Sequence, residues 1–262
     1  MGPAGGRREE PSLQRVTASS RPAPTAVLGI DTATAEVAVA ATDGETVLAE
    51  LSIAAAEGGR PRHTAALFEA VAEAVGAAGG WERIEAIAVG VGPGTFTGLR
   101  VGIASARALA QGRGLPIVAV SSLAALARAI AVADDQLRLA AIDARRGEVF
   151  ATLEAVSGEV VWDPFVVAPA ELGDRIAALG ENVVAAGDGS LRFRRQLMAA
   201  GAEVPPDADP VHRMAARQIC ALAVGAPRVG PEQVRPNYLR KPDAEVWRDQ
   251  QGLGTGPGGG GA

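Results

Sequence analysis

Two glycine-rich turns and two aspartates are the residues whose types and spacing could do chemistry. Residues 92–98 read Gly-Pro-Gly-Thr-Phe-Thr-Gly and open an expected helix, where several backbone N–H groups can bind an anion. Asp31 ends an expected buried strand and could hold a metal or orient water in a nucleotide cleft. Gly187-Asp188-Gly189 ends another strand and would face Asp31 if two lobes closed on each other. Each feature also has a plainer interpretation as a turn that satisfies its own backbone.

The first turn does not fit the known phosphate-binding patterns. The sequence GPGTFTGLR lacks the Gly-Lys-Ser/Thr ending of a Walker A loop, and it lacks the G-x-G-x-x-G spacing of a dinucleotide turn. A tight structural or contact turn is therefore favoured over an anion site, which stays the alternative.

No metal-ligating or nucleophilic set can be assembled from the sequence. His63 begins an expected helix, but a helical zinc site needs a second ligand at i+4, and that residue is Leu67. His212 has no ligand-type neighbour at useful spacing, so neither a Ser-His-Asp nor a Cys-His arrangement can be built. The single cysteine, Cys220, excludes an internal disulfide framework and is interpreted as a core residue.

Arginines are the side chains that could meet a nucleic acid. Arg145 and Arg146 lie at an expected hairpin, and Arg235, Arg240 and Lys241 lie in an extended basic segment near the C-terminus. The net charge of -5 argues against a protein that binds nucleic acid on its own, because binding the phosphates requires clustered positive charge. A solvated surface is favoured, and an RNA-facing patch on a larger assembly is the alternative.

These residues are positioned by alternating strands and helices. Apolar runs and turn signals predict a three-stranded antiparallel meander within 25–53, helices over 63–78 and 98–111, and strands over 86–91 and 115–120. The strand–helix–strand portion predicts a parallel βαβ unit with a right-handed crossover. Hydrophobic residues make up 48% of the chain and aromatic residues only 3%, so Ala, Val, Leu and Ile must build the core.

The opening of the meander recurs downstream, which predicts two lobes. VLGIDTATAEVAVA at 27–40 and LAAIDARRGEVFAT at 139–152 share an apolar strand, Ile-Asp, four residues, Glu-Val and a second strand. No apolar run approaches the ~20 residues that cross a bilayer, and the N-terminus lacks a signal-peptide pattern, so we expect a cytoplasmic protein. The expected divisions are a disordered extension over 1–24, an N-terminal lobe over 25–121, a C-terminal lobe over 122–207, a helix and extended segment packing across the lobes over 208–248, and a disordered glycine-rich tail over 249–262.

Five stretches of the chain resemble the TsaB (YeaZ) family. They are GVGPGTFTGLRVGIASARALA, VLGIDTATAEVAVA, the HTAALF helix start, AIDARRGEVFA and PNYLRKPDAE, and the match covers about residues 25–245. The resemblance implies an α/β fold with two lobes of the actin/hexokinase/Hsp70 (ASKHA) class, each with an RNase H-like βββαβαβ core. This agrees with the element order and the repeat.

The resemblance also implies a role in tRNA modification. A family member is a non-catalytic subunit of the complex that transfers a threonylcarbamoyl group to the adenosine next to the anticodon. Its paralogue TsaD holds the metal and transfers the group, the ATPase TsaE is recruited, and tRNA is met only through the complex. TsaD carries His-x-x-x-His where this chain has His63 and Leu67. The resemblance thus implies no metal and no catalytic residue here.

The same resemblance implies no cofactor in this chain, with any weak nucleotide binding at the complex. A vestigial nucleotide cleft would be lined by Asp31, Thr32, Gly92, Gly94 and Asp188. The competing hypotheses are a stand-alone ATPase or phosphotransferase working in the interlobe cleft, a metallopeptidase of the same fold, and a structural interaction module outside tRNA modification.

The helices over 63–78 and 98–111 carry small-residue faces that a thin lobe is not expected to bury. Because an exposed apolar patch marks an interface, we expect them to form a bundle with the equivalent helices of TsaD, or with a second copy of this chain when TsaD is absent. The expected interface residues are His63, Leu67, Phe68, Val71, Val75, Phe96, Leu99, Arg100, Ile103 and Ala106.

Overall fold

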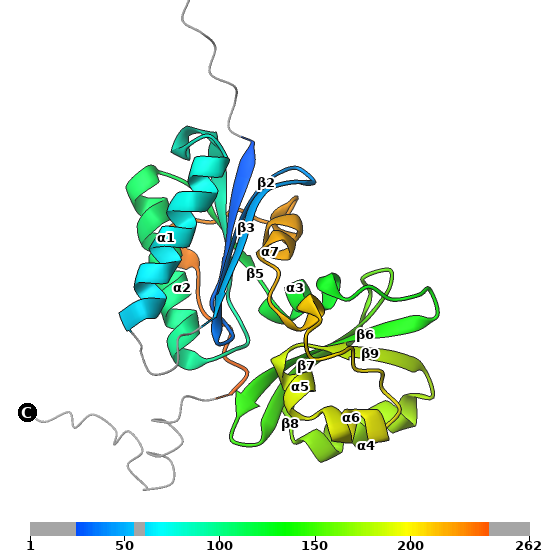
Figure 1. The fold of residues 1–262 in the computed structure, drawn as a ribbon. Helices are drawn as coiled ribbons and strands as arrows, with labels where there is room; N and C mark the ends of the chain where they lie inside the picture. The colour runs from blue at the N-terminus through cyan, green and yellow to red at the C-terminus, as the bar shows by residue number, and fades with distance from the viewer. Residues whose placement is uncertain (1–24, 55–60, 241–262) are drawn as a thin grey trace, which may run out of the picture.

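Two mixed β-sheets organise the chain into an upper and a lower lobe (Figure 1). The computed structural model describes residues 25–54 and 61–240, and for 61–64 only the backbone. The expected disordered segments, 1–24 and 249–262, and the end of the expected extended segment, 241–248, lie outside the described residues. The strand orders are β3-β2-β1-β4-β5 in the first sheet and β8-β7-β6-β9 in the second.

The first lobe has the element order that the sequence predicts. Strands β1, β2 and β3 form an antiparallel meander, and β4 and β5 continue the sheet in parallel with β1. Both helices begin two residues earlier than expected, which is within the fraying of helix ends. The bounds are β1 Ala26–Asp31, β2 Glu36–Asp43, β3 Thr46–Ala54, α1 Pro61–Ala77, β4 Ile84–Gly90, α2 Phe96–Arg113 and β5 Ile117–Val120.

The second lobe repeats this order but its last strand is reduced to one bridge. Glu203 pairs in parallel with Val184 of β9, which is the place that β5 takes beside β4 in the first lobe. Pro205 and Pro206 follow and cannot donate to a ladder, so the strand does not extend in the described chain. The bounds are β6 Gln136–Arg145, β7 Glu148–Ala155, β8 Val160–Val167, α4 Pro169–Leu179, β9 Asn182–Ala186, α5 Asp188–Arg192 and α6 Arg194–Ala199.

Two further helices lie between the sheets (Figure 1). Helix α3 (Ser122–Ala129) packs on β6 and β7, and α7 (Ala216–Ala223) packs on β1 and β2, across the first sheet from α1 and α2. After α7 the chain returns along the first lobe, where Val229 forms an antiparallel bridge with Ile117. It then reaches the second lobe, where Arg240 bonds to Glu148 at 2.8 Å. The C-terminal segment therefore touches both lobes.

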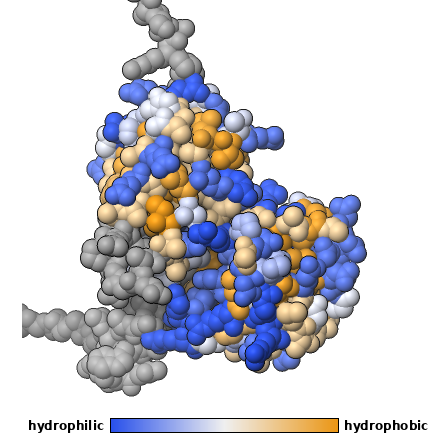
Figure 2. Space-filling model, viewed as in Figure 1, coloured by the Kyte–Doolittle hydropathy of each residue, from blue (hydrophilic) through white to orange (hydrophobic). Residues whose placement is uncertain are grey.

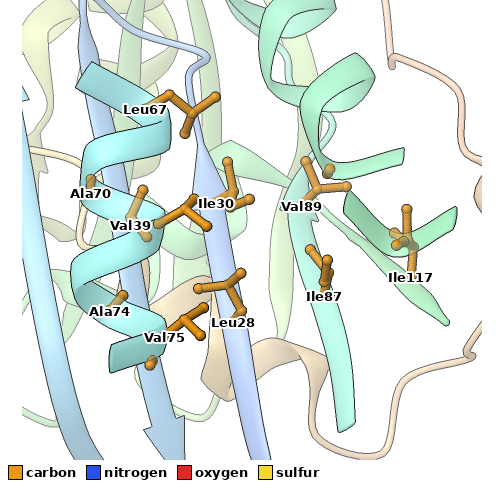
Figure 3. Close-up of a cluster of buried hydrophobic side chains, with 14 of the residues drawn as sticks. Leu28, Ile30, Val39, Leu67, Ala70, Ala74, Val75, Ile87, Val89 and Ile117 are labelled. Carbon is orange, nitrogen blue, oxygen red and sulfur yellow. The ribbon is translucent and has the colours of Figure 1, made fainter. Parts of the chain in front are cut away.

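The core of the first lobe lies between its sheet and the helices α1 and α2 (Figure 3). Leu28 and Ile30 of β1 point from the sheet towards the side chains of α1. The apolar stripes of the two helices are 0–5% exposed, at Leu67, Val71, Val75, Leu99, Ile103 and Ala106. The expectation that one lobe could not bury both stripes is therefore wrong. Five strands spaced about 4.8 Å apart span roughly 20 Å, which is wide enough for two helices.

Candidate functional site

The glycine turn at the start of α2 is a packing contact with the β1–β2 turn. Gly98 and Gly102 lie four residues apart and therefore on one face of α2, and Gly94 lies in the turn just before the helix. A Cβ atom would lie 2.4 Å from the Ala33 carbonyl oxygen at Gly94 and 2.1 Å from the Thr32 carbonyl oxygen at Gly98. The Thr32 hydroxyl donates to the Gly98 carbonyl at 2.8 Å. Close approach of the two segments accounts for these glycines without a phosphate.

Asp31 is buried and both of its carboxylate oxygens are used inside the first lobe. Oδ1 accepts from the Ala33 amide at 2.7 Å, and Oδ2 accepts from the Ser122 hydroxyl of α3 at 2.6 Å. The Ser122 oxygen in turn accepts from the Gly92 amide at 3.2 Å. Burial raises the pKa of Asp31 to about 6, and the bonds from Ser122 and Ala33 offset part of that effect. The carboxylate ties β1, α3 and the glycine turn together.

Asp31→Asn is expected to stabilise the protein at pH 7 and to lose that advantage in acid. The pKa is about 6 in the fold against an ordinary 3.8. The contribution of the carboxyl to stability is therefore fully present below pH 3.8 and is lost as pH rises towards 6. This shift corresponds to about 3 kcal/mol. Urea unfolding at pH 4 and pH 7 should show the variant gaining about 2 kcal/mol on wild type between the two, because the unfolded carboxyl is already partly ionised at pH 4.

The exposed Asp134 on the loop before β6 provides the control. Asp134→Asn should leave the difference from wild type nearly equal at both pH values. The same flat result for Asp31→Asn would show that the Asp31 carboxyl is not desolvated.

Asp143 takes the place in the second lobe that Asp31 takes in the first. Its Oδ1 accepts from the Arg145 amide at 2.9 Å, and its Oδ2 accepts from the guanidinium of Arg192 at 2.8 Å. The Asp143 amide donates to Oδ1 of Asp188 at 2.9 Å. Burial raises the pKa of Asp188. The aspartate pair of this lobe therefore also serves the packing of its own turns.

Four residues of the expected nucleotide cleft, Asp31, Thr32, Gly92 and Gly94, lie together where the β1–β2 turn meets the glycine turn, whereas Asp188 lies in the second lobe. Asp31 and Thr32 are buried in the first lobe, and Gly94 lines a cavity that excludes Asp188. Asp188 lines a groove between the β1–β2 turn and the second lobe, where Figure 2 shows hydrophilic residues at the junction. We call it the acidic groove, after the four carboxylates among Thr34, Glu36, Asp188, Asp207, Asp209, His212 and Arg213. Two of these carboxylates are paired with arginines, Glu36 with Arg213 at 2.8 Å and Asp207 with Arg194 at 2.5 Å.

His212 is buried at the rim of the acidic groove and holds a turn. Its Nδ1 accepts from the Gly187 amide at 3.3 Å, and its Nε2 lies 3.0 Å from the Pro205 carbonyl oxygen. A neutral ring that donates from Nε2 satisfies both contacts. The described residues contain no group of three or more His, Cys, Asp or Glu side chains that could hold a metal ion.

A second cavity of about 400 Å³ lies between the lobes on the other side of Asp143. We call it the interlobe cleft; it is lined by residues 93–96 at the start of α2, 143–146 of the β6–β7 hairpin, Phe150, and 237–240. Phe96 and Tyr238 stack in it with ring centroids 5.3 Å apart. No spacing or periodicity in the sequence indicates that Tyr238 meets Phe96. The only available signal was the position of Tyr238 beside the basic residues of the C-terminal segment.

The residues expected to form the partner interface do not share one surface in the structure. Phe68 is exposed on the outer face of α1, whereas Phe96 and Arg100 lie at the interlobe cleft, where Arg100 sits 3.8 Å from the Phe96 ring centroid. His63 lies in α1, but its side chain is outside the described residues. The other six residues are buried.

Comparisons with known proteins decide the family. The sequence model described as "TsaD: tRNA N6-adenosine threonylcarbamoyltransferase" matches residues 27–188. The Escherichia coli tRNA threonylcarbamoyladenosine biosynthesis protein TsaB is 32% identical over 226 residues, which are 82% of this chain and 94% of that protein. The chain belongs to the TsaB (YeaZ) family.

Solved structures agree with this assignment. YeaZ from Pseudomonas aeruginosa is 27% identical and superposes with a TM-score of 0.66 over 82% of this chain and 100% of its own. A second P. aeruginosa structure, described as similar to peptidase YeaZ, gives a TM-score of 0.68 at 27% identity with the same coverage. These matches confirm the TsaB resemblance and the two-lobe α/β fold.

As a TsaB-type chain, the protein matches the TsaD sequence model through both sheets, from β1 to the first residue of α5. The stretches that carry the TsaB resemblance lie in the fold at packing contacts: GPGTFTGLRVG against the β1–β2 turn and AIDARRGEVFA in the β6–β7 hairpin. Among the described helices of this TsaB-type chain, none is both long and apolar enough to span a membrane.

Proposed function

We propose that this TsaB-type chain is a non-catalytic subunit of the complex that transfers a threonylcarbamoyl group to the adenosine next to the anticodon of tRNAs. In this role it binds and activates a TsaD-type paralogue, and TsaE and tRNA join through that complex in the cytoplasm. The name of the E. coli relative and the family model support the pathway. The observation that carries the subunit role is the outer face of helices α1 and α2.

This outer face carries small residues and Phe68, with Glu69 and Glu73 of α1 also exposed among them. The two helices lie side by side on one face of the first sheet, away from the second lobe (Figure 1). Figure 2 shows tan and orange residues on the flank of the upper lobe where Figure 1 draws α1. We call it the docking face, defined by the exposed residues Ala65, Phe68, Ala72 and Gly76 of α1 and Ala104 and Ala108 of α2.

The docking face suits another pair of helices. Helix axes can approach to about 8 Å when the residues between them are small, and a protruding Phe68 can fill the groove of a partner. Since the chain and TsaD match one sequence model, a TsaD-type partner carries helices in the corresponding positions. A second copy of this chain would offer the same helices when the partner is absent.

The geometry of the buried aspartates supports a non-catalytic role. An ATPase or phosphotransferase in the same fold needs a carboxylate that is free to hold a metal. Both oxygens of Asp31 instead accept hydrogen bonds, from the Ala33 amide and the Ser122 hydroxyl. Turnover of ATP and the metal content of the isolated chain test the stand-alone enzyme, whether phosphotransferase or peptidase. Robust turnover or a stoichiometric metal would overturn the subunit role.

Glutamate on the docking face is expected to abolish partner binding without unfolding the chain. Ala72→Glu and Ala108→Glu each place a charge on a face that must be desolvated, which costs several kcal/mol if the charge is left unpaired. Co-purification with a tagged TsaD-type paralogue should fall at least about 10-fold. Reconstituted tRNA modification should fall with it.

Ala177→Glu on the exposed side of α4 is the matched control, since it adds the same charge to a helix of the second lobe. It should leave co-purification unchanged. If both docking-face variants still hold the partner, the interface lies elsewhere.

A further inference from the structure

The interlobe cleft is rich in arginine although the chain as a whole is acidic. Arg145, Arg146 and Arg240 line it together with Asp143, and Arg240 pairs with the Glu148 carboxylate at 2.8 Å. The Asp143 carboxylate is already bonded by the guanidinium groups of Arg145 and Arg192, at 3.1 and 2.8 Å. The chain carries a net charge of -5, so the cleft gathers side chains of the opposite sign in one place. Such side chains attract phosphates.

One wall of the interlobe cleft is aromatic. Phe96 and Tyr238 stack at an interplanar angle of 28°, and the Arg100 guanidinium lies over the Phe96 ring and donates from Nε to the Tyr238 hydroxyl at 3.3 Å. The two aromatic residues stay 37% and 36% exposed, so part of the pair is open to solvent. Aromatic faces beside arginines are the combination with which proteins hold single-stranded nucleic acid.

The β6–β7 hairpin holds two arginines in an uncommon backbone conformation. Arg145 and Arg146 have φ values of 63° and 53°, in the left-handed region where glycine or asparagine is the usual residue. The Asp143 carboxylate accepts from the Arg145 amide and supports the turn. Residues that are strained by their own backbone tend to occur where the side chain has a use.

We propose that the interlobe cleft binds an RNA strand, with backbone phosphates on Arg145 and Arg146 and one unpaired base stacked on the Phe96–Tyr238 pair. The inference rests on the proposed function, in which the modified adenosine lies in the single-stranded anticodon loop of a tRNA. Proteins recognise RNA mostly at such loops, whose bases are free to stack on aromatic side chains.

The test is tRNA binding by the full chain and by its complex with the TsaD-type paralogue, at about 50 mM salt and above. The variant Arg145→Asn/Arg146→Asn keeps a residue that tolerates the left-handed backbone and removes both charges. We expect it to weaken binding of an unmodified tRNA transcript at least about 10-fold, and to lower the slope of log K against log salt by about 1.5. Tyr238→Leu should weaken binding about fivefold with the slope unchanged, because stacking releases no counterion.

The control is Arg113→Asn/Arg195→Asn, which removes two exposed arginines from α2's far end and from α6. It should stay within about twofold of wild type. Equal losses in the two double variants, or no tRNA binding by chain or complex, would overturn the proposal. ATP binding and co-purification with the TsaD-type paralogue are measured on the same variants. If only ATP binding falls, the cleft binds a free nucleotide, and if only partner binding falls, it binds an acidic protein segment. Either result would overturn the RNA proposal. The docking face is tested separately, because its variants are measured by co-purification with the TsaD-type paralogue.

Discussion

Gly98→Ala is expected to destabilise the protein by about 3 kcal/mol. The new methyl group would lie 2.1 Å from the carbonyl oxygen of Thr32, which is backbone and cannot rotate away. Alanine gains about 1 kcal/mol over glycine in a helix, but this gain is smaller than the cost of pushing α2 off the β1–β2 turn. The melting temperature should fall by roughly 6–12 °C.

Gly112→Ala is the matched control, because Gly112 lies in the same helix and a Cβ there meets nothing within 4 Å. That variant should be as stable as wild type or more stable by about 1 kcal/mol. Equal melting temperatures for the two variants would mean that the contact between α2 and the β1–β2 turn is loose, and the packing explanation of the glycine turn would then fail.

The elements of the first lobe could be predicted because their signals are local. Gly92-Pro93-Gly94 ends β4 and starts α2 within a few residues, and Asp43-Gly44 marks the β2–β3 hairpin. The reason for Gly98 could not be predicted in the same way. Its neighbour is Thr32, which comes close only when the β1–β2 turn and α2 have packed. A glycine that serves a distant contact looks in the sequence like a glycine that serves a loop.

The candidate site shows the same limit. The sequence places Arg145 and Arg146 at a hairpin, because charge and turn signals are local, and favours a solvated surface for them with an RNA-facing patch as the alternative. Their neighbour Tyr238 reaches the cleft because the C-terminal segment returns to it. The backbone amide of Asn237 holds that segment by donating a hydrogen bond to the Val91 carbonyl at 2.7 Å. No periodicity in the sequence encodes that return path. Local signals therefore indicate the arginines that line the cleft but not its aromatic pair.

The two helices of the first lobe show why composition alone misplaced an interface. Periodicity identified the apolar stripe of α1 correctly, but a stripe does not say whether a sheet or a partner covers it. The five-stranded sheet covers the stripe, and the residues between the stripes remain for docking. Val71 and Ala72 are neighbours in the chain that fall on opposite sides of this division.

Val71→Glu is expected to prevent stable folding, whereas Ala72→Glu is expected to fold like wild type. Val71 is 2% exposed within the core between α1 and the sheet, so a glutamate there buries a carboxyl without a partner at a cost of at least about 4 kcal/mol. That is a large part of the 5–15 kcal/mol by which such proteins are stable. Ala72 is exposed, and the same side chain there stays in water.

Soluble yield and urea unfolding followed by circular dichroism separate the two outcomes. Val71→Glu should give little folded protein or a transition shifted far to low urea, and Ala72→Glu should keep the wild-type midpoint while it loses the TsaD-type partner. If Val71→Glu instead folds normally and fails only in partner binding, the buried stripe of α1 opens to the partner in solution. In that case the bundle would be built from the core residues of the helix rather than from its outer face.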